Sequence, residues 1–244
     1  MIAPFDLIFA ALFSVGYMLW EYAVGWKRTK AALISGRPGA RARAYRTTIA
    51  VQWTFVAVLA ARWISAGRRW RELGLALPEG WRLVAGAVLV LLTAALFTRQ
   101  ARAVARLGEE QRLRLRDQLA SVALVLPRTA SEQRWFRALA VTAGFCEELL
   151  YRGFLVWALR PWLGLAGATA ASLVLFTLGH SYQGAKGAVR SGIAGATMAA
   201  IVLLTGSLIP AMLVHAIVDL GGGTVGYLIL CEPRDEPAPT PLAA

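Results

Sequence analysis

Three charged residues lie close together in an apolar stretch of the chain, AGFCEELLYRGF over residues 143–154. Glu148 and Arg152 are four residues apart, so on a helix they share one face, with the acid nearer the N-terminus, the favourable order for an ion pair. Glu147 points about 100° away from Glu148 on the same helix. We therefore predict that Glu148 and Arg152 neutralise each other. Glu147 then faces elsewhere, unpaired, as a candidate general base.

The only two histidines of the chain, His180 and His215, lie in two further apolar stretches. Asp219 follows His215 by one helical turn, so its carboxylate can orient the imidazole ring. Phe176 precedes His180 by the same interval and can form a wall of the same site. A lone histidine is usually a packed core residue, but two of them with three carboxylates in apolar segments indicate a site that handles protons. A purely structural ion-pair network is the alternative interpretation of the same residues.

Other hydrolytic chemistries leave signatures that this sequence lacks. There is no H-E-x-x-H zinc motif and no G-x-S-x-G nucleophile motif. Cys146 is an alternative nucleophile, but a helix turns it about 100° from Glu147, and small buried cysteines are usually inert. Cys146 and Cys231 show neither disulfide nor metal-ligand spacing.

The composition indicates that these residues must be positioned by membrane-spanning helices. The chain of 244 residues is 57% hydrophobic and only 16% charged, far from the balance of a soluble domain. A span needs about 20 apolar residues. We therefore predict an all-α, polytopic transmembrane helix bundle of about seven spans, within a range of six to eight, around a polar intramembrane cavity. The predicted spans are roughly 3–24, 47–66, 81–98, 135–158, 162–180, 187–205 and 207–230.

The net charge of +12 comes from basic residues in the loops that flank the apolar spans. This distribution predicts contact with the anionic cytoplasmic leaflet of a membrane and no nucleic-acid partner. The basic loops 25–46 and 99–134 should be cytoplasmic, which places the N-terminus outside. The segment 67–80 conflicts with this assignment, because strict alternation puts its three arginines, Arg68, Arg69 and Arg71, outside.

The chain divides into three predicted regions. Residues 1–126 contain N-terminal transmembrane helices and a basic amphipathic cytoplasmic helix within 99–126. The first segment reads as an anchor that is retained and not as a cleaved signal peptide. Residues 127–231 form the helical core that carries the candidate site. Residues 232–244 are rich in proline and form a disordered tail.

Three motifs in successive apolar segments resemble those of the CAAX-processing and bacteriocin-processing intramembrane endopeptidases, the CPBP or Abi family. Each motif alone is weak, but the ordered set is fairly specific, and the resemblance covers roughly residues 127–225. The motifs are E-E-x-x-x-R (Glu147, Glu148, Arg152), F-x-x-x-H (Phe176, His180) and H-x-x-x-D (His215, Asp219).

The resemblance implies an intramembrane peptidase whose active site lies in a cavity open to the cytoplasm. Its substrate would be a membrane-associated protein or peptide, with CAAX-type proteins as one class. By position, Glu147 would activate the attacking water with help from His180. His215 and Asp219 would stabilise the tetrahedral oxyanion. The residues that would shape and neutralise the site are Glu148, Arg152 and Phe176.

Asp219 departs from the prenyl-protein branch of that family, which usually has asparagine there. An ionised carboxylate repels an oxyanion, so Asp219 more plausibly orients His215 or is itself protonated. The departure also keeps a zinc site under consideration, with Glu147, His180 and His215 as ligands and one open position. We prefer a mechanism that requires no cofactor, and zinc is the alternative.

Two other functions fit the same buried polar residues. One is a non-catalytic membrane scaffold or bacteriocin-immunity protein that uses the cluster for stability. The other is a proton-coupled transporter, which is disfavoured because the sequence shows no internal repeat. For the peptidase, the predicted location is a bacterial inner membrane.

Overall fold

The computed structural model of the chain describes residues 2–120 and 122–231. Helices make up nearly all of this described part, and no strand occurs in it, which confirms the predicted all-α class. The predicted tail, 232–244, lies outside the described residues. The proposed division of the chain at residue 126 stays a prediction.

The N-terminal third of the chain forms two long antiparallel helical rods. The first rod is continuous, although its hydrogen bonding alternates between α-helical and π-helical segments. Its segments are α1 (Pro4–Ala11), η1 (Leu12–Gly16), α2 (Tyr17–Trp20), η2 (Glu21–Gly25) and α3 (Trp26–Ile34). The second rod is α4 (Ala40–Ser65), followed by the short 3₁₀ helix η3 (Trp70–Leu73).

The remaining helices complete the bundle around the candidate site. They are α5 (Trp81–Ala105), α6 (Glu109–Gln118), α7 (Ala130–Glu147), the π-helix η4 (Glu148–Leu155), α8 (Val156–Gly179), η5 (Ser181–Gln183), α9 (Gly184–Thr205) and α10 (Leu208–Leu230). Helix α7 lies at the centre and packs mainly against α10 and α4. Helices α8 and α9 pack against η4, so a site at the junction of α7 and η4 is bordered by α4, α8, α9 and α10.

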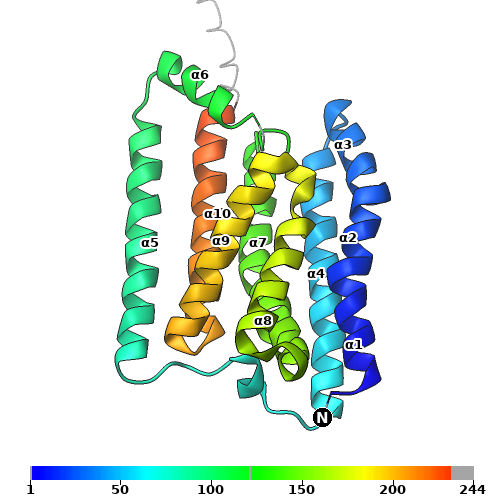
Figure 1. Cartoon of the computed structure of the whole chain (residues 1–244). Coiled ribbons are helices and arrows are strands. Elements are labelled where there is room, and N and C mark those ends of the chain that lie inside the picture. The colour runs from blue at the N-terminus through cyan, green and yellow to red at the C-terminus, as the bar shows by residue number, and fades with distance from the viewer. Residues whose placement is uncertain (1, 121, 232–244) are drawn as a thin grey trace, which may run out of the picture.

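Six helical stretches in the described part are long and apolar enough to cross a membrane. One of them, Ala130–Gly179, has 50 residues and would be about 75 Å long if straight, more than twice the thickness of the hydrocarbon core. Gly164 interrupts it with φ 66° and ψ 177°, a conformation that only glycine adopts readily. The chain reverses direction there (Figure 1) and so runs the length of the bundle seven times. Both the count of helices and this number of passes lie within the predicted range of six to eight.

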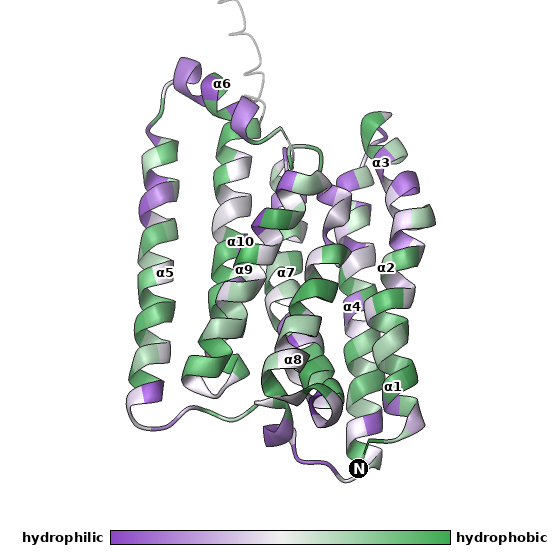
Figure 2. Ribbon diagram, in the orientation of Figure 1, coloured by the Kyte–Doolittle hydropathy of each residue, from purple (hydrophilic) through white to green (hydrophobic). Residues whose placement is uncertain are grey.

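The ends of the bundle are more hydrophilic than its middle (Figure 2). One end carries the α3–α4 turn, α6 and the end of α10, and the other carries the N-terminus, residues 66–80 and the α9–α10 turn (Figure 1). The basic loops 25–46 and 99–134 thus meet at the same end, as predicted. Within 99–126, α5 continues to Ala105 and the separate helix α6 starts after Gly108. The amphipathic cytoplasmic character of this segment stays a prediction.

The conflict over segment 67–80 has a structural explanation. Alternation holds, so this segment lies at the end opposite to the basic loops. Arg68 is folded inward: its guanidinium donates two hydrogen bonds to the fully buried Asp6, at 3.0 and 2.6 Å, and stacks over Trp63 and Trp157. An arginine neutralised in this way contributes less to the positive charge that sets topology.

Candidate active site

The predicted ion pair between Glu148 and Arg152 is present. Arg152 Nη1 lies 3.2 Å from Glu148 Oε1, and both side chains are almost fully buried. They lie on η4, a π-helical segment that begins directly after Glu147. π-Helical insertions in α-helices occur frequently at functional sites, because they redirect side chains on one turn.

Arg152 also connects this pair to two neighbouring helices. Its Nη2 donates to the backbone carbonyl of Gly195 on α9 at 3.0 Å. Its guanidinium lies 4.1 Å from the centre of the Phe176 ring on α8. The Phe176 ring also packs against the imidazole ring of His180, and the two ring centroids are 4.4 Å apart. Phe176 therefore does form a wall between the ion pair and the first histidine, as predicted.

His215 is held by a residue that sequence reasoning did not assign to it. Its Nδ1 donates to Glu148 Oε1 at 2.8 Å, across the contact between α10 and η4. Its Nε2 lies 3.6 Å from Asp219 Oδ2 and 4.0 Å from Glu147 Oε2. Glu148 thus accepts a hydrogen bond from His215, and Asp219 contacts the other ring nitrogen at the longer distance of an ion pair. The role of Asp219 in orienting the ring stays a prediction, and Glu148 is a second residue that orients it. Spacing along one helix could not show a partner on another.

Glu147 is not unpaired, contrary to the prediction. Gln52 of α4 donates a hydrogen bond from Nε2 to Glu147 Oε1 at 2.8 Å. The other carboxylate oxygen, Oε2, faces His215. Gln52 is a member of this cluster that could not be assigned from spacing, and the available signal was a single amide within the apolar span 47–66. Its own carbonyl oxygen is buried and has no hydrogen-bond partner among the described residues.

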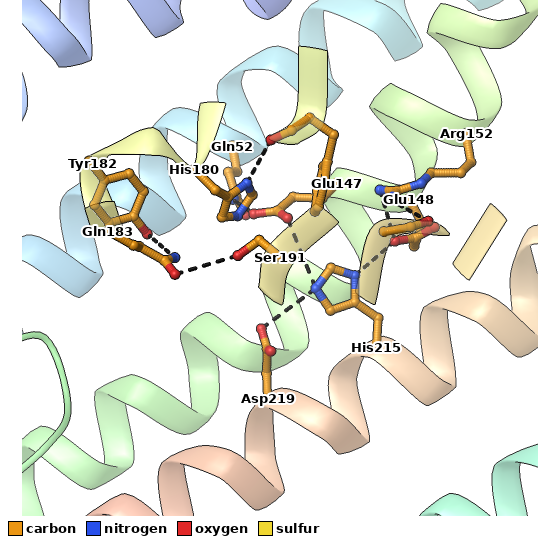
Figure 3. Close-up of polar contacts among 12 residues, drawn as sticks. Gln52, Glu147, Glu148, Arg152, His180, Tyr182, Gln183, Ser191, His215 and Asp219 are labelled. Atoms are coloured by element: carbon orange, nitrogen blue, oxygen red, sulfur yellow. Dashed lines mark hydrogen bonds and ion pairs between the residues drawn. The ribbon is translucent and has the colours of Figure 1, made fainter. Parts of the chain in front are cut away.

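His180 was predicted to lie inside the span 162–180. It lies instead in the turn after α8, which ends at Gly179. Its Nδ1 lies 2.8 Å from the carbonyl oxygen of Phe176. A carbonyl only accepts, so Nδ1 carries the proton, and Nε2 of the neutral ring is left as an acceptor. In the view of Figure 3 the Glu147 carboxylate lies between the His180 and His215 rings. The structure thus brings Glu147, His215 and Asp219 within contact distance, and His180 approaches from the turn.

The zinc alternative requires Glu147, His180 and His215 to converge on one point. Among the residues that the structure describes, no three His, Cys, Asp or Glu side chains are arranged to hold a metal ion. Nδ1 of His215 is committed to Glu148, and its Nε2 faces two carboxylates. Glu147, His180 and His215 therefore do not form a cluster of metal ligands in this structure. Cys146 is fully buried in the apolar core, which is the environment of an inert packing residue.

The fold and this site together define a multi-pass helical membrane protein with a buried carboxylate–imidazole cluster. The model of the family described as "Type II CAAX prenyl endopeptidase Rce1-like" matches residues 131–221. This segment is less than half of the chain, but it contains all three motifs, and the match confirms the resemblance that those motifs indicated. It points to a peptidase of the CAAX-processing kind. Comparisons with curated proteins and with solved structures gave no match.

Proposed function

We propose that this protein is an intramembrane endopeptidase in which Glu147 activates a water molecule for attack on a peptide bond. The observation that carries the proposal is the placement of Glu147. One of its oxygens is held by Gln52, the other faces His215, and its side chain keeps about one sixth of its surface exposed, 16%. A carboxylate that is fixed in position and still reachable fits a general base.

In the proposed reaction, Glu147 Oε2 takes a proton as the water oxygen bonds to the substrate carbonyl carbon. The tetrahedral intermediate then collapses, the C–N bond breaks, and Glu147 returns the proton to the leaving amine. His180 assists by accepting a hydrogen bond from the water at Nε2. Because no redox change occurs, the reaction needs only water and the peptide.

His215 is the proposed partner of the oxyanion. Its Nδ1–H is donated to Glu148, so Nε2 is the nitrogen that faces the substrate. To donate from Nε2 the ring must carry a positive charge, and the carboxylates of Glu147, Glu148 and Asp219, all within 4.0 Å of ring nitrogens, balance that charge. This assignment gives Asp219 a role that an asparagine could not fill, namely to offset the charge of an imidazolium.

The proposed substrate is a membrane-associated protein or peptide with an apolar tail, of CAAX type or similar. The Asp219 side chain is 39% exposed, more than those of Glu147 and His215, and His180 lies in the α8–α9 turn, so access from the end that carries this turn is favoured. We place this end at the cytoplasmic face of a bacterial inner membrane, on the basis of its basic loops.

The decisive experiment incubates the purified protein with prenylated and unprenylated tail peptides, with and without a chelator. The wild-type protein should cleave at least one class, and Glu147→Gln should lower kcat by about a hundredfold or more, because general bases contribute about 10²–10⁴. Glu21→Gln, the same change at another carboxylate in an apolar span, should leave cleavage intact.

Full activity of Glu147→Gln would refute the mechanism. In-cell function without any cleavage would favour the scaffold alternative. Loss of activity with chelator would favour zinc.

A further inference from the structure

A second polar feature lies at the end of the bundle that carries the basic loops. A cavity of about 410 Å³ opens between the α3–α4 turn and the start of α7. This volume lies within the range of roughly 300–1,000 Å³ that small-ligand sites occupy. The predicted site residues around Glu147 do not line it.

The lining of this cavity has an excess of positive charge. Arg37, Arg41 and Arg128 contribute to it, against the single carboxylate of Glu132. Glu132 is largely engaged, since its Oε2 accepts the backbone N–H groups of Arg128 and Thr129 at 2.8 and 3.3 Å. Three guanidinium groups therefore face one carboxylate that already caps a helix.

The arginines keep donors available. Nε of Arg128 is buried and has no hydrogen-bond partner in the described part of the chain. Arg41 uses Nε for the carbonyl of Leu124 at 3.1 Å and lies 3.6 Å from Glu132 through Nη1. Arg37 is exposed at the rim. Planar guanidinium forks of this kind match the oxygens of a phosphate group, which they bind with two parallel hydrogen bonds.

The rim of the cavity is amphipathic. Leu33 and Ile34 line it beside the arginines, and the Ile34 side chain is 67% exposed. A small inorganic anion would leave these apolar groups without a partner. A ligand with a phosphate head and an apolar body would cover both kinds of surface.

The cavity lies far from the catalytic carboxylate of the proposed peptidase. Ala130 begins α7 and Glu147 ends it, so the cavity lies about 25 Å along the helix from the catalytic carboxylate. A peptide bound at Glu147 would need many further residues to reach Arg128. The cavity is therefore a separate site.

We infer that this cavity binds the phosphate group of an anionic lipid, which Arg37, Arg41 and Arg128 hold at the surface of the membrane. Such a ligand would tie the α3–α4 turn to the start of α7. These are the ends of the two helices that carry Gln52 and Glu147, so occupancy would stabilise the pair of helices that positions the catalytic carboxylate. The inference concerns binding and does not depend on peptidase activity.

The test measures the thermal stability of the purified full-length protein in neutral detergent as lipid is added. Phosphatidylglycerol should raise the melting temperature more than phosphatidylcholine. Arg37→Gln/Arg128→Gln should weaken that response by about tenfold in lipid concentration or more, since losing one charge-assisted hydrogen bond corresponds to about an order of magnitude. Arg43→Gln/Arg106→Gln, which removes two exposed arginines outside the cavity lining, is the matched control.

Three outcomes would overturn the inference. Equal stabilisation by both lipids would show that no phosphate-specific contact to the anionic lipid exists. An equal loss of response in the cavity variant and the control would assign the effect to overall charge. Full stabilisation by inorganic phosphate alone, with nothing added by phosphatidylglycerol, would assign the cavity to a soluble phosphate. If Arg37→Gln/Arg128→Gln fails to fold, Arg37→Gln alone, at the exposed rim, provides the same comparison.

Discussion

Gln52 and Glu147 are 95 positions apart in the chain and meet through one hydrogen bond of 2.8 Å. The bond fixes which carboxylate oxygen is available, because the amide of Gln52 occupies Oε1. A carboxylate only accepts when ionised, so the amide must present its NH₂ group to Glu147, and its carbonyl is left buried without a partner among residues 2–120 and 122–231. Leaving a buried acceptor unsatisfied costs about 1–3 kcal/mol. A residue retained at such a cost is best explained by its effect on Glu147.

Replacing Gln52 tests this effect. Gln52→Leu keeps much of the volume and removes the donor, so Glu147 loses its fixed orientation. We expect kcat to fall by about tenfold or more with KM nearly unchanged, because small misplacements of a catalytic group can lower rates by as much as about a hundredfold. The measurement is steady-state peptide cleavage. A change in KM alone, with kcat intact, would contradict a positioning role.

The pair of Glu148 and Arg152 makes a second prediction at this scale. Arg152→Met removes the cation and leaves the Glu148 carboxylate buried, and breaking a buried pair in this way costs about 3–5 kcal/mol. The free energy of unfolding in detergent should fall by about that amount. The double variant Glu148→Gln/Arg152→Met should recover part of the loss, because no uncompensated charge remains. If the double variant is less stable than Arg152→Met alone, the loss does not come from the unpaired carboxylate.

At the scale of the elements, the contact between α7 and α10 decides the geometry of the site. At Gly144 the two helices come so close that an added Cβ would lie 2.7 Å from the backbone nitrogen of Ala216. His215 precedes Ala216, so the same close approach brings its ring to Glu148 on η4. The backbone spacing at Gly144 and the hydrogen bond between His215 and Glu148 are therefore linked.

Gly144→Ala should separate these two helices. Overpacking of this kind costs about 1–3 kcal/mol, so we expect a lower melting temperature and weaker cleavage. Gly222→Ala on α10 is the matched control, because a Cβ there meets nothing within 4 Å and alanine favours the helix. Equal melting temperatures and rates for the two variants would show that the close approach at Gly144 is not required.

At the scale of the whole molecule, the seven passes place the described loops at two opposite ends of the bundle (Figure 1). The basic α3–α4 turn and α6 share one face with the α8–α9 turn that carries His180. Segment 66–80 lies at the other face, where Asp6 neutralises Arg68. The arrangement places the arginine-lined cavity and the accessible edge of the candidate site on the same side of the membrane.

Labelling of single cysteines from each side of the membrane tests this topology. In a Cys231→Ser background, with the buried Cys146 left in place, Ser35→Cys and Glu110→Cys should react with a membrane-impermeant reagent from the same side. Glu79→Cys should react only from the opposite side. Labelling of all three from one side would mean that the number of passes is even both between residues 35 and 79 and between residues 79 and 110, which would contradict the single passes of α4 and α5.

The sequence by itself determined the class of the molecule and most members of its site. Hydropathy along the chain is a local property, so the all-α bundle, the range of spans and the shared end of the basic loops could be predicted. The ion pair of Glu148 and Arg152 was predictable for the same reason, because both residues lie on one helical turn. Only the tertiary structure decided which residues meet across helices. Gln52 donates a hydrogen bond to Glu147, and Glu148 accepts the hydrogen bond from His215 that was not expected from spacing. Such contacts depend on how closely neighbouring helices pack. Spacing along a single helix does not encode that distance.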